Sequence, residues 1–331
     1  MPQVVVAPAQ RHSLHSDGAI WRETNCYTDV WIEVLHALGL EPLAMLGPCL
    51  RVTLEADQWT FFKPSFDDLY ALYGIDVVET NPWRGLVQTC VTAAETGHIA
   101  LPEVDSWFLP DTAGVSYQLA HVKSTIAVLA IDVAAKELSY AHNAGCYELS
   151  GSDFDGLFGL GHYERTADHL PPYVDMLTPP DATKISNRDL AERSLSILGR
   201  NVARLPRPNP FDEWSQRFGA EIEAVRATAN GEGFHGYAFT TFRQFGPAFE
   251  LSARHLHWLA TESLLPPSSR SAMRTAADRY SSIASTALVL QMRTARAVMS
   301  GKPLDPTPWM TELSDAWHEA GEALRSLGTL P

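Results

Sequence analysis

Residues 26–38, CYTDVWIEVLHAL, carry the pattern that decides the fold. Apolar residues recur there at steps of three and four, at Tyr27, Val30, Trp31, Val34, Leu35 and Leu38. This spacing predicts an amphipathic helix with one buried face. Thr24 and Asn25 precede the run and both are good N-caps, so Cys26 is expected in the first helical turn.

A cysteine in the first turn of a helix has two interpretations. The positive end of the helix dipole and the unpaired backbone N–H groups favour the thiolate there, which would make Cys26 a nucleophile. Free cysteine is also among the most buried residue types, so Cys26 could instead be a small core residue. A base and an orienting group elsewhere in the chain would decide between the two.

Length and composition predict a globular protein of about two domains. The chain has 331 residues, of which 45% are hydrophobic and 19% are charged. No apolar run approaches the ~20 residues of a transmembrane helix, and residues 1–10 have neither the basic flank nor the apolar core of a signal peptide. We therefore expect a soluble, cytoplasmic protein that has no contact with a membrane.

Neither the cysteines nor the histidines predict a metal site or a disulfide framework. The four cysteines, Cys26, Cys49, Cys90 and Cys146, form no CxxC pair and no metal-finger spacing. The closely spaced histidines, His12 with His15 and His255 with His257, match no metal-ligand pattern. Cys49, Cys90 and Cys146 are expected in the core.

The net charge of −14 argues against nucleic-acid binding, which requires a basic face. An acidic partner would need a local basic patch, and one arginine-rich stretch is a candidate: Arg188, Arg193, Arg200, Arg204, Arg207, Arg217 and Arg226. Acidic residues are interspersed among these arginines. The stretch is therefore interpreted as an ordinary solvated helix surface.

The first half of the chain predicts helices followed by an antiparallel sheet. Residues 66–73 and 82–96 have helical patterns, and short strands are expected at 49–54 and 59–63. The segment 102–109 is β-like, and 125–131 (TIAVLAI) is typical of a strand buried on both faces. A turn at 132–136 and a return arm at 137–141 complete a predicted hairpin, and a short strand follows at 146–149.

The second half predicts a helical bundle. Residues 151–183 are rich in glycine, proline and aspartate, which indicates a connection or a lid. From residue 187 onward, helical patterns are separated by proline and glycine breaks, at 190–205, 210–229, 239–264, 266–299 and 306–327. The predicted organisation is a catalytic domain at 1–160, a connection at 161–186 and a helical bundle at 187–331, and the fold class is α+β.

His121 is the candidate base for Cys26. It precedes the buried strand, a rigid position for a base. Asn143 follows the return arm, so pairing of the two arms would bring His121 and Asn143 to the same end of the hairpin. The order of a helix with the nucleophile, a strand with the base and an orienting Asn is that of papain-like enzymes, although the separations are shorter and no Cys-Gly-Ser-Cys signature surrounds Cys26.

Several alternatives to this assignment remain open. Asp105 or Asp132 could orient the imidazole in place of Asn143, which could be a turn residue before Ala144-Gly145. Asp105 could instead hold a substrate amine. His142 is a competing base, although strand alternation points it to the opposite face from Asn143.

Five short stretches carry a family resemblance. They are Asp17-Gly18, Asn25-Cys26, the run 104–112 (VDSWFLPDT), His121-Val122-Lys123 and the run 142–145 (HNAG). They resemble a bacterial family that is distantly similar to the N-terminal domain of the butirosin-biosynthesis acyltransferase, which moves an acyl group from a carrier protein to an amine. The resemblance continues through 239–258 and so spans most of the chain. In butirosin-type enzymes aspartate tends to occupy the position of Asn143.

The resemblance implies a papain-like cysteine acyltransferase with a thioester donor. Members are associated with carrier-protein ligases that resemble seryl-tRNA synthetases, which implies an aminoacyl group on the phosphopantetheine of a carrier protein. In this reading Cys26, His121 and Asn143 are catalytic, and the Cys26 backbone N–H and Asn25 stabilise the oxyanion. The thioester supplies the driving force, so no cofactor is expected. A hydrolase using the same residues and a non-catalytic scaffold that docks a carrier protein or a ligase are the alternatives.

Overall fold

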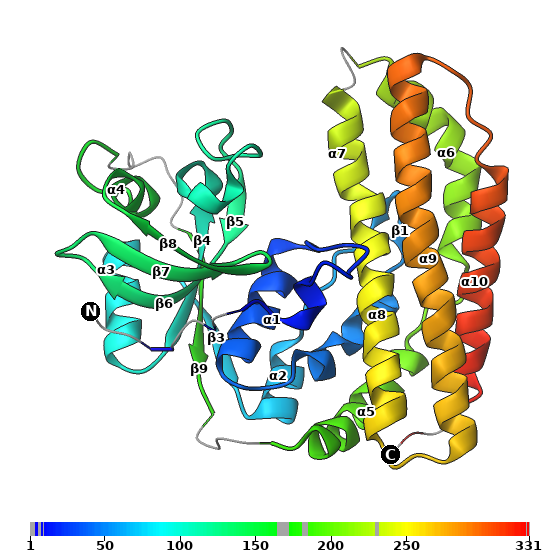
Figure 1. Ribbon diagram of the computed structural model, residues 1–331, viewed down its shortest axis with the longest axis horizontal. Coiled ribbons are helices and arrows are strands. Elements are labelled where there is room, and N and C mark those ends of the chain that lie inside the picture. The colour runs from blue at the N-terminus through cyan, green and yellow to red at the C-terminus, as the bar shows by residue number, and fades with distance from the viewer. Residues whose placement is uncertain are drawn as a thin grey trace. The chain divides into compact units, whose positions relative to one another are not determined.

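The computed structural model describes residues 4, 5, 8, 10–163, 172–180, 185–228, 232–328 and 330. Antiparallel sheets with helices occupy the first half of the chain, and long helices follow (Figure 1). The predicted α+β class and the order of its two halves are therefore confirmed.

The chain forms two compact units that interleave along the sequence. The sheet unit consists of Met1–Asp17, Asn25–Pro42 and Phe66–Ile185, and the helical unit of Gly18–Thr24, Leu43–Ser65 and Ser186–Pro331. The long helical stretch begins next to the predicted position 187. Two earlier segments, however, belong to the same helical unit, and composition did not reveal this.

The sheet unit is built on a four-stranded antiparallel sheet in the order β3-β9-β4-β5. Its strands are β3 (Asp76–Thr80), β9 (Val174–Thr178), β4 (Ile99–Asp105) and β5 (Lys123–Thr125). β9 lies within the segment predicted as a connection or lid. That prediction is wrong for β9, because its five residues pair with strands on both sides; residues 164–171 and 181–184 of the segment lie outside the described residues.

A three-stranded antiparallel meander continues from this sheet (Figure 1). It consists of β6 (Ala127–Asp132), β7 (Glu137–His142) and β8 (Gly145–Ser150). The Ile126 N–H donates to the Pro102 carbonyl at 3.2 Å, so β5 passes into β6 while still attached to β4. The predicted hairpin is confirmed, with Asp132 opposite Glu137 and Ala127 opposite Ala141.

Helix α1 (Cys26–Ala37) begins where its sequence predicted. The Asn25 side chain accepts a hydrogen bond from the Thr28 N–H at 2.8 Å and caps the helix. Every residue from Thr28 to Leu35 is buried, and α1 packs against β5, β7 and β8. The prediction of a single buried face is therefore wrong: α1 is enclosed on all sides, including the side that carries Asp29 and Glu33.

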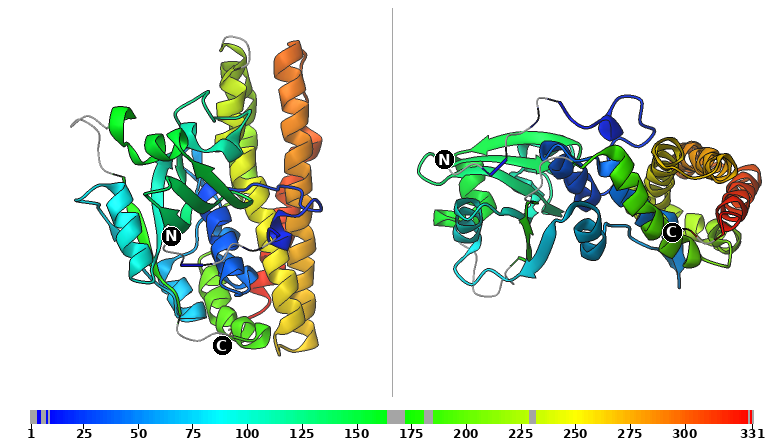
Figure 2. Two further views of the ribbon diagram at one scale, coloured as in Figure 1. Left: turned by 60° about the vertical axis from the view of Figure 1, so that its left-hand side comes forward. Right: turned by 90° about the horizontal axis from the view of Figure 1, so that it is seen from below.

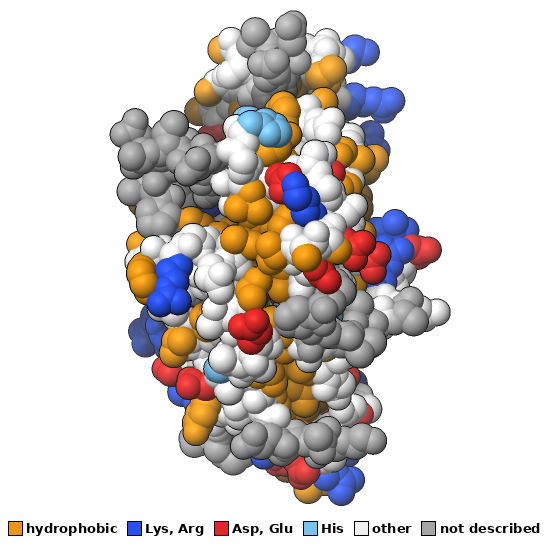
Figure 3. Space-filling model, turned by 90° about the vertical axis from the view of Figure 1, so that its left-hand side faces the viewer, with side chains coloured by type: hydrophobic (Ala, Val, Ile, Leu, Met, Phe, Trp, Pro, Cys, Tyr) orange, Lys and Arg blue, Asp and Glu red, His pale blue; other side chains and the backbone are white. Residues whose placement is uncertain are grey.

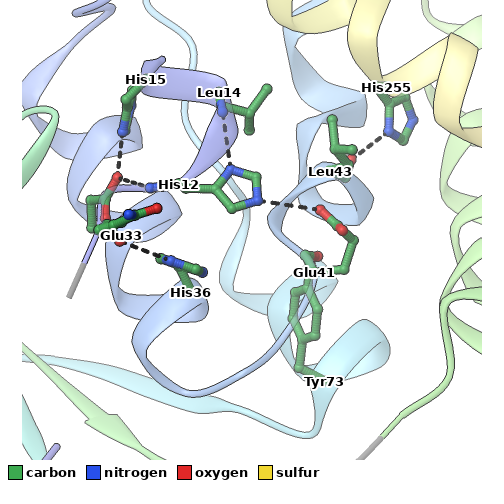
Figure 4. A network of polar contacts seen from close by, with 10 residues as sticks. His12, Leu14, His15, Glu33, His36, Glu41, Leu43, Tyr73 and His255 are labelled. Atoms are coloured by element: carbon green, nitrogen blue, oxygen red, sulfur yellow. Dashed lines mark hydrogen bonds and ion pairs between the residues drawn. The ribbon is translucent and has the colours of Figure 1, made fainter. Parts of the chain in front are cut away.

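His15 contacts the two buried carboxylates of α1, and Figure 4 shows its contact with Glu33. Its Nδ1 lies 2.6 Å from Glu33 Oε1 and its Nε2 lies 3.2 Å from Asp29 Oδ1, and all three side chains are at most 1% exposed. The His12 backbone N–H also donates to Glu33 Oε1 at 3.1 Å. Burial alone would lower the pKa of His15, but the hydrogen bonds and charges of Asp29 and Glu33 outweigh it and raise that pKa to about 9.

The other helices of the sheet unit are α2 (Phe66–Tyr73), α3 (Leu86–Glu95) and α4 (Ser152–Phe158). α3 starts four residues later than predicted, because Gly85 has φ +92° and cannot continue a right-handed helix. α3 and α4 contribute Cys90 and Phe154 to a core that includes Val128 and Tyr140 of the meander.

The helical unit contains six α-helices among its described residues. They are α5 (Asn187–Ala203), α6 (Pro210–Arg226), α7 (Glu232–Thr240), α8 (Phe242–Glu262), α9 (Pro267–Ser300) and α10 (Thr307–Arg325). α9 packs against both α8 and α10, and the right-hand view of Figure 2 shows these helices nearly end-on. The predicted helical bundle is confirmed.

Aromatic packing holds the early segments within the helical unit. Residues 49–63 form a 3-10 helix, η2 (Pro42–Arg51), and the two-residue strands β1 (Leu54–Glu55) and β2 (Gln58–Trp59), instead of the longer strands predicted. The Trp59 ring lies 4.5 Å from that of Phe245 and 5.2 Å from that of Phe211, measured between centroids. Trp21 donates its indole N–H to the Ala284 carbonyl at 3.1 Å.

Charged groups do not form a continuous basic face in the view shown. In Figure 3, acidic and basic side chains are interspersed around a central band of hydrophobic ones. Within the arginine-rich stretch, Arg217 pairs with Glu213 and Glu221 on α6, in line with its interpretation as a helix surface.

No helix in the described part of the chain is long and apolar enough to cross a membrane.

The buried His15 predicts a pH-dependent stability. Because its pKa rises from 6.5 to about 9 on folding, its contribution is complete below pH 6.5 and is lost as the pH rises through 9. That contribution amounts to about 3 kcal/mol. We expect the urea midpoint of the sheet unit to fall across this range in wild type and to be lower and flatter in His15→Gln. In the control His36→Gln, which removes a half-buried ring that contacts neither Asp29 nor Glu33 and is bonded to the Gln10 carbonyl, the wild-type slope should persist.

Gly246 gives a prediction for the helical unit. A Cβ at this position of α8 would lie 2.6 Å from the Trp21 ring, whereas a Cβ at Gly236 of α7 would meet nothing within 4 Å. Gly246→Ala should lower the free energy of unfolding by about 1–3 kcal/mol through overpacking. Gly236→Ala should be neutral or stabilising by up to about 1 kcal/mol. Equal effects of the two variants in thermal unfolding would contradict the close packing of Trp21.

Candidate functional site

Cys26 occupies the first position of α1, at the end where backbone N–H groups lack helical partners. Its side chain is partly exposed. The next residue, Tyr27, donates its hydroxyl to Asp175 Oδ2 of β9 at 2.7 Å. Burial, followed by the charge of Asp175, raises the pKa of Tyr27, so this hydroxyl remains a donor at neutral pH. The first turn of α1 is thus fixed to the central sheet.

His121 is held by a carboxylate and an indole. Its Nδ1 lies 2.6 Å from Asp105 Oδ2, and its ring stacks on Trp107 with centroids 4.4 Å apart and planes 10° apart. A carboxylate that accepts from Nδ1 leaves Nε2 as the nitrogen that can take a proton. The side chain of His121 is 67% exposed, so this nitrogen is open to a substrate.

Asp105 is itself fixed in orientation. Its second oxygen, Oδ1, accepts the Trp107 N–H at 3.0 Å and caps the short helix η3 (Ser106–Phe108). Two backbone bonds close the loop that separates Asp105 from His121: the Ser106 N–H donates to the Val122 carbonyl at 2.9 Å, and the Gln118 N–H to the Trp107 carbonyl at 3.1 Å. The carboxylate and the imidazole therefore belong to one closed loop.

Strand alternation places this pair on the sheet face that α1 covers. Asp175, which Tyr27 contacts, lies directly opposite Leu101 in the register of β9 and β4. Side chains at Leu101 and Asp105, four residues apart in one strand, point to the same face. α1 also packs against β5, which starts two residues after His121. Across the described residues, no hydrogen bond joins Cys26 to His121.

The structure assigns the orientation of His121 to Asp105, one of the alternatives that the sequence left open. Asn143 has φ +43° and lies in the two-residue turn between His142 and Gly145, which pair across the β7–β8 hairpin. Asn is favoured in such turns because it tolerates the left-handed region. Asp132 lies at the other end of β6, where it accepts the Ala135 N–H. Asn143 therefore lies in a turn, and its predicted role as the orienting residue stays a prediction beside the observed contact of Asp105.

Asn25, the predicted oxyanion residue, uses its side-chain oxygen as the cap of α1. Its amide nitrogen belongs to the same side chain, and the backbone N–H of Cys26 follows as that of the first helical residue. Both donors thus occur at the helix N-terminus, where an oxyanion would be favoured. The oxyanion assignment stays a prediction.

Another buried imidazole–carboxylate pair, separate from that of His15, lies in the sheet unit. His142 Nδ1 is 2.6 Å from Asp111 Oδ2, its Nε2 is 2.6 Å from Ser124 Oγ, and Tyr140 donates to Asp111 Oδ1 at 2.6 Å. We call these four residues the buried network. The order of Ser, His and Asp is that of a hydrolase triad. Ser124 is 6% exposed and the side chains of His142 and Asp111 are 1% and 2% exposed, so no substrate reaches them.

Sequence reasoning missed the buried network except for the direction of His142. Alternation along β7 places Tyr140 and His142 on one face, opposite Ala141, as predicted for His142. Asp111 lies in the stretch 104–112 and Ser124 directly follows the stretch 121–123. The two residues are brought together only by the fold, through His142. Two-residue alternation across β5 and β7 was the only signal available for it.

The remaining cysteines are poor nucleophiles. Burial raises the pKa of Cys90 to about 12 and raises that of Cys49 as well. Burial, followed by the charge of Glu33, raises the pKa of Cys146 to about 12. Cys49 and Cys90 are core residues as predicted, and Cys146 is partly exposed. In the described part of the chain no group of three His, Cys, Asp or Glu side chains is arranged to hold a metal ion.

Two family models match the chain. The DUF1839 N-terminal domain matches residues 10–178, and the DUF1839 C-terminal domain matches residues 187–326. No curated protein matches it. The border between the two matches falls next to the start of α5.

The thiol environments predict which cysteine reacts. At pH 7.5, a pKa of about 12 leaves Cys146 with a thiolate population roughly a thousandfold below that of a free thiol. We expect iodoacetamide to label Cys26 first and Cys146, Cys49 and Cys90 at least about a hundredfold more slowly, as read by peptide mass spectrometry. Preferential labelling of Cys146 would contradict this order. A denatured sample, in which all four should react alike, is the control.

Proposed function

The chain belongs to the DUF1839 family, and we propose that it is a cysteine-dependent acyltransferase with a papain-like catalytic unit. In this proposal Cys26 is the nucleophile, His121 the base and Asp105 the residue that orients the base. The observation that carries the proposal is the 2.6 Å contact between His121 Nδ1 and Asp105 Oδ2, on the sheet face covered by the helix that Cys26 begins.

The first half-reaction forms an acyl-enzyme. The Cys26 thiolate attacks the carbonyl carbon of a thioester, and a tetrahedral oxyanion forms. The Cys26 backbone N–H at the N-terminus of α1 is assigned to this oxyanion, with Asn25 as the predicted second residue. The carbon–sulfur bond of the donor then breaks, and the donor thiolate leaves with a proton from the His121 imidazolium.

The second half-reaction transfers the acyl group to an amine. His121 Nε2 takes a proton from the amine as its nitrogen attacks the acyl carbon, and Cys26 leaves as the thiolate. Asp105 keeps the proton on Nδ1 and stabilises the imidazolium that forms. The atoms balance without a cofactor, because the thioester bond supplies the driving force.

The identity of the donor and of the partner follows from the sequence resemblance. That resemblance supports an aminoacyl group on the phosphopantetheine of a carrier protein. The −14 charge of the chain requires such an acidic partner to dock at a local basic surface. A small-molecule aminoacyl-pantetheine thioester tests the chemistry independently of docking.

Hydrolysis is the competing reaction, and the exposure of His121 favours it. A side chain that is 67% exposed admits water as readily as an amine. Incubation of the thioester with and without added amine separates the two reactions by product. Transfer predicts an amide that increases with amine concentration, whereas a hydrolase yields free acid under both conditions. A scaffold predicts no acyl-enzyme at all.

Two variants test which residue orients His121: the isosteric Asp105→Asn, and Asn143→Gly, which preserves the turn. Asp105→Asn should reduce kcat by about a hundredfold or more, because the amide can present its N–H to Nδ1 and favour the wrong tautomer. Asn143→Gly keeps a residue that accepts a positive φ and should change kcat by no more than a few-fold. A large loss in Asn143→Gly with wild-type activity in Asp105→Asn would reverse the assignment.

The acyl-enzyme gives a direct test of the nucleophile. Cys26→Ala should abolish the mass increase that a thioester produces on the wild-type protein, and Cys146→Ala should retain it. Loss of turnover is expected to be on the order of 10⁴-fold or more in Cys26→Ala. Wild-type turnover in Cys26→Ala would end the proposal.

A further inference from the structure

The buried network connects the elements that carry the proposed catalytic pair. Ser124 lies in β5, three residues after His121. Asp111 lies in the short helix η4 (Pro110–Thr112), in the loop that begins at Asp105. His142 of β7 contacts both of them, and Tyr140 of β7 contacts Asp111. The network therefore joins the two ends of the loop to a third element behind it.

We propose that this network is a positioning device for Asp105 and His121. The inference rests on the proposed function, because it assigns the network a role toward that pair. Asp111, Ser124, Tyr140 and His142 are positioning residues in this view, since their side chains are buried and touch no substrate.

One arrangement of protons satisfies the whole network. The Tyr140 hydroxyl and the His142 Nδ1–H both donate to the Asp111 carboxylate, and the Ser124 hydroxyl donates to His142 Nε2. Burial, followed by the charge of Asp111, raises the pKa of Tyr140, so this donor keeps its proton. A single negative charge on Asp111 is thereby buried with two donors. Removing a partner leaves that buried charge or the Nε2 acceptor unsatisfied, which is costly.

His121 depends on such support because it has little of its own. Its side chain is 67% exposed, and the ring is held by Asp105 and Trp107, both on the far side of the loop. The distance between His121 Nδ1 and Asp105 Oδ2 thus depends on how β5 lies against residues 105–112. The pairing of β4 with β5 and two backbone bonds, from Ser106 to Val122 and from Gln118 to Trp107, set this beside Asp105. The hydrogen bonds from Ser124 through His142 to Asp111 fix β5 against the loop a second time, at Asp111.

The network is also better explained by positioning than by catalysis of its own. A Ser-His-Asp triad requires the serine oxygen to reach a substrate carbonyl. Ser124 is 6% exposed, and its hydroxyl is bonded to the buried His142. Tyr140 also occupies the second oxygen of Asp111, so all four side chains are fixed within the interior.

Nuclear magnetic resonance of the His121 ring nitrogens tests the proposal without a substrate. In wild type the spectrum should report a protonated Nδ1 bonded to Asp105, and Asp105→Asn supplies the reference for loss of that bond. Ser124→Ala should move the His121 signals toward the Asp105→Asn positions, and Ser124→Thr, which keeps the hydroxyl, should restore them. Ser139→Ala on β7 is the matched control outside the network and should leave them unchanged.

The rate of Cys26 acylation provides the second readout. A misplacement of the base by about 1 Å costs up to about a hundredfold, so Ser124→Ala should slow acylation by that order while Ser139→Ala does not. Near-UV circular dichroism establishes that each variant is folded. A folded Ser124→Ala with wild-type ring signals would overturn the inference, as would the same signals in Ser124→Ala and Ser139→Ala. If Ser124→Ala does not fold, Ser124→Thr decides. Shifted His121 signals in Ser124→Thr, which keeps the hydroxyl, would also overturn the inference, because the hydroxyl would then support folding without fixing the His121 ring.

The two readouts separate the inference from the proposed function. If acyl transfer fails for every substrate, the ring signals still decide whether the network positions His121. If acyl transfer succeeds and the ring signals do not respond to Ser124→Ala, the positioning role falls and the catalytic assignment stands.

Discussion

The sheet unit depends on the burial of the central part of α1. Eight consecutive residues of this helix are buried, and two of them, Asp29 and Glu33, are carboxylates. Charges in a dry interior are tolerated only with partners, and His15 supplies both contacts from the N-terminal segment. That segment is thereby held against the helix, and Tyr27 fixes the first turn to β9. Cys26 thus begins a helix that cannot shift without breaking buried ionic contacts.

Local patterns identified the elements, and tertiary pairing decided their roles. The cap at Asn25, the limits of α1 and the 125–141 hairpin followed from spacing, because each depends on neighbours in sequence. The enclosure of α1 did not, since periodicity assigns polar residues such as Glu33 to solvent. β9 escaped notice because glycine and proline around it indicated a connection. Asp105 was one candidate among three for the orienting residue, because a contact across sixteen residues leaves no periodic signal.

Two of the imidazole–carboxylate pairs in the sheet unit, at His121 and at His142, have contacts of the same length but opposite exposure to solvent. The contacts of His121 with Asp105 and of His142 with Asp111 are both 2.6 Å long. His121 is open to solvent, so its second nitrogen can exchange protons with a substrate. His142 is closed off, and its second nitrogen is committed to Ser124. A histidine bonded to a carboxylate can thus act on a substrate where it is exposed and can only stabilise the fold where it is buried.

The interleaving of the two units has a consequence for how the chain is made. Trp21 bonds to a carbonyl 263 residues further along, and Trp59 packs on Phe245. During synthesis both tryptophans leave the ribosome long before α8 and α9 exist to receive them. The helical unit can close only when the last third of the chain has appeared. The segments that carry Trp21 and Trp59, on either side of α1, lack their packing partners until then. A gene truncated after the sheet unit would therefore encode a protein in which both tryptophans lack those partners.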